Sequence, residues 1–229
     1  MSKVPVMTID GPSGSGKGTV SRAAARALGW GLLDSGALYR LVALAGRQAG
    51  IALDDAPGLA RLAESARLGF GSGSTGEEVV WLDGQDVTRA IRTEEAGNDA
   101  SKVAAIPQVR AALLERQRRF AAPPGLVADG RDMGTVVFPG AEVKIFLTAS
   151  AAERALRRYK QLKEKGVAAN LAALSLEIAE RDLRDSTRTA SPLVASADAV
   201  LLDTTGMSVD TVVERVLEVA RGRLSREVL

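Results

Sequence analysis

Cysteine and histidine are both missing from this chain of 229 residues. Thiol nucleophiles, disulfides, zinc sites and imidazole bases are therefore excluded. Aromatic residues make up only 3%, so the core must consist mostly of Ala, Val and Leu. Chemistry in such a chain has to run on lysine, arginine, carboxylates, backbone dipoles and a hard cation such as Mg²⁺. Phosphoryl transfer is a reaction that these groups can catalyse, because positioning and charge neutralisation do most of the work.

A large excess of either charge is also missing. The chain has 30 basic and 28 acidic residues, a net charge of +2, although its pI is about 9.1. A general affinity for nucleic acid or anionic membranes is therefore poorly supported. No apolar run approaches the length of a membrane span, and the first residues lack a cleavable apolar segment. We expect a cytoplasmic monomer that binds neither nucleic acid nor a membrane.

Five short apolar runs, each ending in an acid or a turn residue, alternate with helical patterns. This alternation predicts an α/β fold, a five-stranded parallel sheet with helices on both faces. The predicted strands are residues 4–10, 31–34, 126–129, 143–147 and 199–203. The predicted helices are residues 16–28, 37–49, 108–120, 152–164, 171–183 and 209–223. Ligands of such folds gather at the carboxyl ends of the strands, which predicts one site built from the segments after Asp10, Asp34 and Asp129.

Residues 51–93 interrupt this alternation. A Gly/Ser tract at residues 69–76 precedes an alternating run at residues 78–82 and a turn at Gly84, which predicts a small antiparallel β insertion. The tract is also compatible with a disordered linker. Trp81 is expected to pack this insertion. The core domain then comprises residues 1–50 and 94–229.

A glycine-rich loop follows the first apolar run directly and leads into a helix. Successive backbone N–H groups, the positive end of the helix and Lys17 can together bind the phosphates of a nucleoside triphosphate. The pattern departs from GxxxxGK(S/T) at Gly18, and the hydroxyl comes one residue late at Thr19, which weakens the case for direct ligation of Mg²⁺ by the loop. An ordinary Gly/Ser turn is the alternative. This phosphate loop consists of Gly11, Pro12, Ser13, Gly14, Ser15, Gly16, Lys17, Gly18 and Thr19.

Charged side chains follow two of the other predicted strands. Asp129, Arg131 and Asp132 place three charges within four residues at a strand end, which is costly unless a ligand or a mutual salt bridge satisfies them. Ser35 and Arg40 follow the second strand, where they could meet a phosphate or a base. A helix cap at Asp34 or Ser35 and a solvated charge at Arg40 would explain the same residues.

Two helical segments carry further charges. Arg181, Asp185 and Arg188 are spaced i, i+4 and i+7, so they lie on one stripe of a helix. Between residues 153 and 165, six basic residues stand against two acids. Solvated helix faces are the simplest meaning of both patterns.

Three motifs and the phosphate loop together resemble the bacterial cytidylate kinases. The motifs are residues 34–40 (DSGALYR), 129–135 (DGRDMGT) and 181–188 (RDLRDSTR), and the resemblance extends from residue 4 to the last helix. It implies a P-loop kinase that phosphorylates CMP and dCMP with ATP in pyrimidine metabolism. The reaction implied is direct in-line transfer of the γ phosphoryl group, giving CDP and dCDP.

The resemblance also implies roles for residues on the acceptor side. Arg40, with Ser35 nearby, and Arg131 and Arg188 would contact the phosphate of the monophosphate. Asp132 would accept a hydrogen bond from the exocyclic amine of cytosine. The family pattern places Ser101 and Arg110 on the cytosine ring, although both look like surface residues when read alone. Arg181 and Asp185 would contact the sugar hydroxyls.

On the donor side, the basic helix resembles a lid. The lid would span residues 154–170, with Arg157 closing over the triphosphate, and residues 51–93 would be the insertion that binds the monophosphate. Mg²⁺ is expected near Thr19 and Asp129, held through water. Lys17, Arg131, Arg157 and Arg188 are then the predicted catalytic residues.

Other functions can be weighed against this one. A GTPase switch would need an NKxD motif, and neither Asn98 nor Asn170 begins one. A nucleic-acid-dependent ATPase would need a wide basic surface, which the balanced charge argues against. A related kinase that acts on UMP, AMP or a small metabolite stays open.

Overall fold

The structure, a computed structural model, describes residues 4–72, 78–164 and 166–224. The chain divides into two compact units, one formed by the residues up to 34 together with those from 118 onward, the other by residues 35–117. The predicted Gly/Ser tract and lid extend into residues 73–77 and 165, which lie outside the described residues. Among those described, no helix combines the length and the apolar character that crossing a membrane requires.

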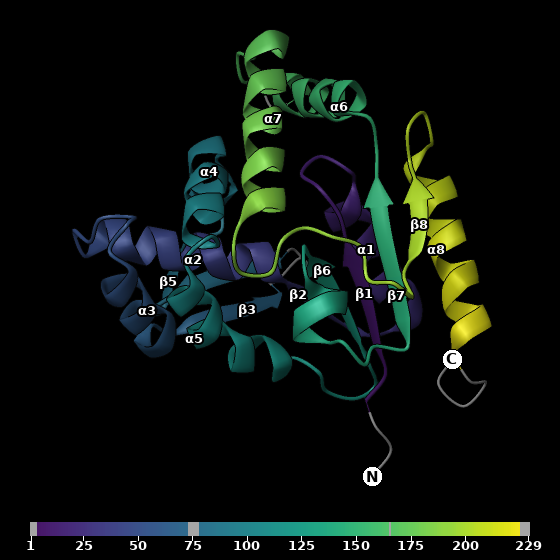
Figure 1. Ribbon diagram of the computed structural model, residues 1–229, viewed down its shortest axis with the longest axis horizontal. Helices are drawn as coiled ribbons and strands as arrows, with labels where there is room; N and C mark the ends of the chain where they lie inside the picture. The colour runs from purple at the N-terminus through teal and green to yellow at the C-terminus, as the bar shows by residue number, and fades with distance from the viewer. Residues whose placement is uncertain (1–3, 73–77, 165, 225–229) are drawn as a thin grey trace. The chain divides into compact units, whose positions relative to one another are not determined.

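Five strands form the sheet of the first unit, in the order β2-β6-β1-β7-β8, and every neighbouring pair is parallel (Figure 1). The prediction of a five-stranded parallel sheet is therefore confirmed. The register pairs Asp129 with both Ile9 and Asp34, so the carboxyl ends of β1, β2 and β6 meet at one edge. The strands are β1 (Val6–Asp10), β2 (Gly31–Asp34), β6 (Leu126–Gly130), β7 (Val143–Thr148) and β8 (Val200–Asp203).

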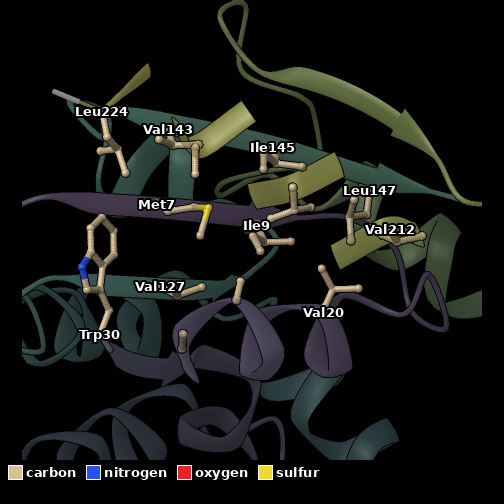
Figure 2. Packing of buried hydrophobic residues seen from close by; sticks show 14 residues of the cluster. Met7, Ile9, Val20, Trp30, Val127, Val143, Ile145, Leu147, Val212 and Leu224 are labelled. Atoms are coloured by element: carbon tan, nitrogen blue, oxygen red, sulfur yellow. The ribbon is translucent and has the colours of Figure 1, made fainter. Parts of the chain in front are cut away.

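Helices α1 and α8 pack against the sheet through small and branched side chains. Val20 of α1 and Val212 of α8 meet Met7, Ile9 and Ile145 in one buried cluster (Figure 2). Burying each such side chain contributes about 1.5–3 kcal/mol, so this layer holds the first unit together. The helices of this unit are α1 (Lys17–Leu28), the π-helical turn η2 (Met133–Val137), α6 (Ala151–Glu164), α7 (Leu171–Thr187) and α8 (Val209–Arg223).

The second unit combines helices with a small antiparallel sheet, β3-β4-β5, as the pattern around Gly84 predicts. Trp81 packs across β3, where a Cβ on Gly71 would lie 2.8 Å from its ring, so the expectation that Trp81 packs the insertion is confirmed. The elements are α2 (Ser35–Gln48), α3 (Ala56–Ser65), β3 (Leu68–Ser72), β4 (Glu78–Leu82), β5 (Gln85–Asp86), η1 (Ala90–Arg92), α4 (Glu94–Val103) and α5 (Pro107–Arg118).

Helix α3 is not indicated by the sequence pattern, because Pro57 and Gly58 are typical of a loop. In the structure, the side chain of Asp55 caps this helix by accepting a hydrogen bond from the Gly58 amide at 2.9 Å. Proline is well tolerated in the first turn, where its missing N–H costs no intrahelical bond. The cap and the proline therefore start a helix that apolar periodicity alone does not reveal.

Candidate active site

The phosphate loop connects β1 to α1 and depends on glycine at its first position. Gly11 has a φ of 151°, and a Cβ there would lie 2.1 Å from the Leu147 carbonyl oxygen. Gly16 caps α1 in a left-handed conformation, without a side-chain hydrogen bond. The hydroxyl of Ser15 is buried and makes no hydrogen bond to any described residue. A buried hydroxyl at a helix N-terminus without a partner suits an anionic ligand.

Lys17 lies at the start of α1, where its buried side chain turns back over the loop. Its Nζ donates a hydrogen bond to the Pro12 carbonyl at 3.0 Å. Burial, together with the positive charge of Arg131, lowers the pKa of Lys17 to about 7, while the negative charge of Asp129 acts in the opposite direction. An anion beside the ammonium would restore its charge, because an opposite charge favours the ionised form.

Asp129 stands at the end of β6 beside the start of α1. A Cβ on Gly18 would lie 3.2 Å from its Oδ2, so glycine at position 18 leaves room for this carboxylate. Burial raises the pKa of Asp129 to about 6, and the positive charge of Lys17 acts in the opposite direction. The departure from the GxxxxGK(S/T) pattern at Gly18 thus coincides with the close approach of an acid to the loop.

The residues around the loop fit an ion that is carried by a nucleotide. Within the described parts of the chain, no group of three or more acids could enclose a metal ion by itself. Mg²⁺ needs no such group, because it usually keeps several waters and binds one or two carboxylates together with substrate phosphates. Asp129 is a carboxylate in the right place for this mode, whereas Thr19 is exposed.

Arginines that follow β6 or belong to α7 and its C-terminal end surround one buried acid. Arg131 Nε donates to Asp185 Oδ2 at 3.0 Å, and both side chains are largely buried. Burial by itself would raise the pKa of Asp185, but the positive charges of Arg131, Arg181 and Arg188 hold this pKa below its usual value. Arg131 and Arg181 also lower the pKa of Lys17. The stripe predicted on one helix therefore faces the strand end that carries Arg131.

Arg188 and Asp132 extend this cluster. Their side chains are almost completely buried, and Arg188 Nη2 lies 3.7 Å from Asp132 Oδ1. Arg188 Nε donates to the Ser191 carbonyl, which holds the guanidinium at the end of α7. Three guanidinium groups in a mostly buried position could bind a phosphate with charge-assisted hydrogen bonds. A surface stripe of solvated charges, the alternative for α7, is ruled out for Asp185 and Arg188, because both are buried.

Helix α6 places Arg157 against the phosphate loop. Its guanidinium donates to the Ser15 carbonyl at 3.4 Å and to the hydroxyl and the carbonyl of Thr204, which follows β8. Thr204 is itself buried and donates to the Ser15 carbonyl at 3.2 Å. The predicted residue Arg157 therefore lies beside the loop, and Thr204 is a partner that the sequence analysis missed.

Arg154 is a second residue that sequence reasoning did not single out. Its buried guanidinium donates to the Ala149 and Ser13 carbonyls at 3.0 Å each, and to both oxygens of Asp182 on α7. One side chain therefore links α6, α7 and the phosphate loop. In the sequence, Arg154 is one of six basic residues between 153 and 165, and nothing in that run distinguishes a buried arginine from an exposed one.

The remaining predicted residues belong to the second unit. Arg40 of α2 donates to the Ile91 carbonyl at 2.7 Å, and Ser35 is buried at the start of the same helix. Ser101 and Arg110 are both buried, which corrects their appearance as surface residues. Arg110 donates to the Ala104 carbonyl at 3.2 Å and lies 5.6 Å from the centre of the Tyr39 ring, in a cation–π contact that helix periodicity does not reveal.

The family model described as cytidylate kinase matches residues 7–222. Cytidylate kinase of Marinomonas sp. (strain MWYL1) is 58% identical over 212 residues, covering 93% of each chain. Cytidylate kinase of Methylococcus capsulatus is 56% identical over 218 residues, covering 95% of this chain and 97% of the relative. The resemblance carried by the three motifs is thus confirmed along nearly the whole sequence.

Solved structures show the same fold at much lower identity. An uncharacterized protein from Eubacterium ventriosum superposes with a TM-score of 0.53 at 10% identity, over 96% of this chain and 100% of that one. A superposition at this low identity shows the fold alone. The family is shown by the match to the family model and by the relatives that are 56–58% identical. This chain belongs to the cytidylate kinase family.

Proposed function

We propose that this protein transfers the γ phosphoryl group of ATP directly to CMP and dCMP, giving CDP and dCDP. Membership of the family confirms the predicted enzyme class, a nucleoside monophosphate kinase. The observation that carries the proposal is the gathering of Arg131, Arg181 and Arg188 around the buried Asp185, in the same charge network as Lys17. Two anion-binding groups of residues in one unit suit a reaction between two nucleotides.

The phosphate loop, residues 11–19, would bind the triphosphate. Backbone amides at the start of α1 and the Ser15 hydroxyl would donate to phosphate oxygens. The ammonium group of Lys17 would exchange its hydrogen bond to the Pro12 carbonyl for contacts with the β and γ phosphates. Arg157 would contact the same phosphates from α6. The lid role of residues 154–170 is part of this proposal. Its closure would exclude water, so that ATP is not merely hydrolysed.

The acceptor phosphate would be bound by Arg40, Arg131 and Arg188. No general base is needed, since a phosphate oxygen is already anionic near neutral pH. The arginines would neutralise the two nucleotides and the charge that spreads over the transferred group in the transition state. Arg181 and Asp185 would contact the sugar hydroxyls, and Ser35 would lie near the phosphate.

Recognition of cytosine is assigned to Asp132, Ser101 and Arg110. An ionised carboxylate only accepts hydrogen bonds, so Asp132 suits an exocyclic amine and disfavours the carbonyl that uracil has at this position. We keep residues 51–93 as the monophosphate-binding insertion and residues 1–50 and 94–229 as the core. The proposal includes a cytoplasmic monomer that binds no nucleic acid.

Mg²⁺ fits this site as part of the bound ATP. Asp129 would hold the hydrated ion, with Thr19 as a second contact through water. When bound, the ion would neutralise phosphate charge and orient the donor. The chain's own groups position the two nucleotides.

The test is a panel of acceptors with ATP as the donor: CMP, dCMP, UMP, AMP, GMP and shikimate. CMP and dCMP are expected to react fastest. A better rate with an acceptor that lacks the cytosine amine would refute the role of Asp132. Lys17→Met should leave the fold intact and abolish transfer, whereas Lys102→Met, an exposed lysine on α4, should react like the unaltered protein. Near-normal turnover of Lys17→Met would refute the donor site.

A further inference from the structure

Asp10 ends strand β1 and directly precedes the phosphate loop. Its carboxylate is buried, with 5% of the residue exposed, and each oxygen accepts one backbone hydrogen bond. Oδ1 accepts from the Met133 amide at 2.9 Å, and Oδ2 accepts from the Gly134 amide at 2.8 Å. Because two oxygens bind two successive amides, the contact fixes the orientation of the turn as well as its position.

The turn that Asp10 binds directly follows two residues proposed to bind the acceptor nucleotide. Met133 and Gly134 open η2, and the residue before them, Asp132, makes no side-chain capping bond of its own. Arg131 precedes Asp132. The carboxylate of Asp10, at the end of β1, therefore caps η2 although the two lie more than a hundred residues apart in sequence. Short π-helical turns frequently occur at functional sites.

The ionised form of this carboxylate is electrostatically destabilising in the fold. Burial raises the pKa of Asp10 to about 7, and the negative charges of Asp132 and Asp129 act in the same direction, while the two amides oppose them. The nearby Lys144 directs its Nζ to the Pro139 carbonyl and to Asp198. A buried carboxylate among other acids lowers stability, so stability alone does not explain an acid at position 10.

The turn also fits closely against β1. A Cβ on Gly134 would lie 2.9 Å from Thr8 Oγ1 and 3.4 Å from Asp10 Oδ2. The hydroxyl of Thr8 is buried and has no hydrogen-bond partner among the described residues, so Thr8 contacts the turn without holding it. Asp10 is thus the side chain of β1 that binds this turn through hydrogen bonds.

We propose that Asp10 is a positioning residue that couples the phosphate loop to the acceptor-binding turn. Through Met133 and Gly134 it sets where Arg131 and Asp132 stand relative to the loop that begins at Gly11. A shift of the phosphate loop would then be transmitted to Arg131 and Asp132, and a shift of these residues would be transmitted to the loop. This inference rests on the proposed function for the acceptor roles of Arg131 and Asp132.

Asp10→Asn tests the proposal, because asparagine has the same shape but only one oxygen. Its amide group would point an N–H at a backbone N–H, so one hydrogen bond is lost and the turn moves away. The KM for CMP should rise by about tenfold, which corresponds to the loss of about one hydrogen bond. The KM for ATP should stay within about twofold, and the preference for CMP over UMP should fall.

Thr8→Val is the matched control, since it alters the same strand and the same contact surface without removing a hydrogen bond. Both of its KM values should stay close to those of the unaltered protein. A role that is only structural would lower the melting temperature or the amount of active enzyme and leave the ratio of the two KM values unchanged. An unchanged ratio in Asp10→Asn, whether both values rise together or neither does, overturns the proposal.

Gly134→Ala provides a second route if Asp10→Asn does not fold. The added methyl group pushes the same turn away from β1, so the KM for CMP should rise selectively. The double variant Thr8→Ala with Gly134→Ala removes the closest contact of the added methyl group, which is the one with Thr8 Oγ1, and should recover most of the loss. Absence of a selective rise, or of the recovery, overturns the proposal. If the unaltered enzyme prefers another acceptor, the proposed function fails, and the same ratio measured with that acceptor still decides the role of Asp10.

Discussion

Arg131, directly after β6, and Asp185 on α7 form a hydrogen-bonded ion pair in which Nε and Oδ2 lie 3.0 Å apart, and this pair joins two segments of the first unit. Asp185 is buried, and three arginines surround it. Opposite charges in such a position hold each other in place, and removing one leaves the others repelling. The pair therefore sets the direction of the Arg131 guanidinium.

Asp185→Asn should weaken binding of the acceptor much more than binding of the donor. The neutral amide no longer balances the arginines, so Arg131 turns away and the KM for CMP rises by about tenfold or more. The KM for ATP should change little. Steady-state kinetics with each substrate varied in turn measures both, and an equal change in the two KM values would contradict this role.

Arg154→Lys should loosen the contact between α6, α7 and the phosphate loop. Lysine keeps the charge but cannot bind both oxygens of Asp182 and the Ser13 carbonyl together, so the free energy of unfolding should fall by about 1–3 kcal/mol. The KM for ATP should rise, because Ser13 belongs to the loop. Urea unfolding and ATP kinetics measure the two effects. Arg215→Lys, at an exposed arginine on α8, should show neither effect.

The pH dependence of stability should differ between the unaltered protein and Asp10→Asn. In the unfolded chain Asp10 loses its proton near its ordinary pKa of 3.8, but burial in the fold raises this pKa to about 7. Between these values the folded state binds the extra proton, so the contribution of Asp10 to the free energy of unfolding falls as pH rises. The slope is at most about 1.4 kcal/mol per pH unit, and it levels off above pH 7.

Asp10→Asn lacks this titration, so its stability relative to the unaltered protein should improve from pH 4 to pH 7. Chemical unfolding at several pH values gives the difference directly, and other carboxylates cancel in the comparison. Thr8→Val should follow the unaltered protein at every pH. Parallel curves for Asp10→Asn and the unaltered protein would show that Asp10 keeps its ordinary pKa in the fold.

Asp129→Asn should raise the Mg²⁺ concentration that gives half-maximal activity by about tenfold, because a neutral amide binds a hydrated cation more weakly than a carboxylate does. Chelation of the metal should stop transfer in both proteins. Asp210→Asn, an exposed carboxylate on α8, should leave the Mg²⁺ dependence unchanged. An unaltered Mg²⁺ dependence in Asp129→Asn would remove Asp129 from the metal site.

The sequence predicts the parts of this protein whose signals are local. The sheet strands follow from apolar runs, and the phosphate loop follows from glycines next to Lys17. The i, i+4 and i+7 spacing places Arg181, Asp185 and Arg188 on one stripe. The register of β1, β2 and β6 then brings Asp129 to the expected edge.

The contacts that hold the site together are not predictable from local patterns. Asp10 binds amides more than a hundred residues away, and Arg154 and Thr204 also contact the loop from positions that are remote in sequence. Their residue types suit many places on a surface, so only the fold reveals that they are buried. Arg110 is similar, because its contact with Tyr39 joins two separate helices.

The close approach of Gly11 to the main chain of β7 has a consequence for inhibition. Any larger residue at position 11 would collide with the Leu147 carbonyl, which cannot move aside as a flexible side chain can. A compound that rests on this part of the loop would therefore meet a surface that resistance mutations cannot easily reshape. Escape from such a compound would have to arise at more tolerant positions.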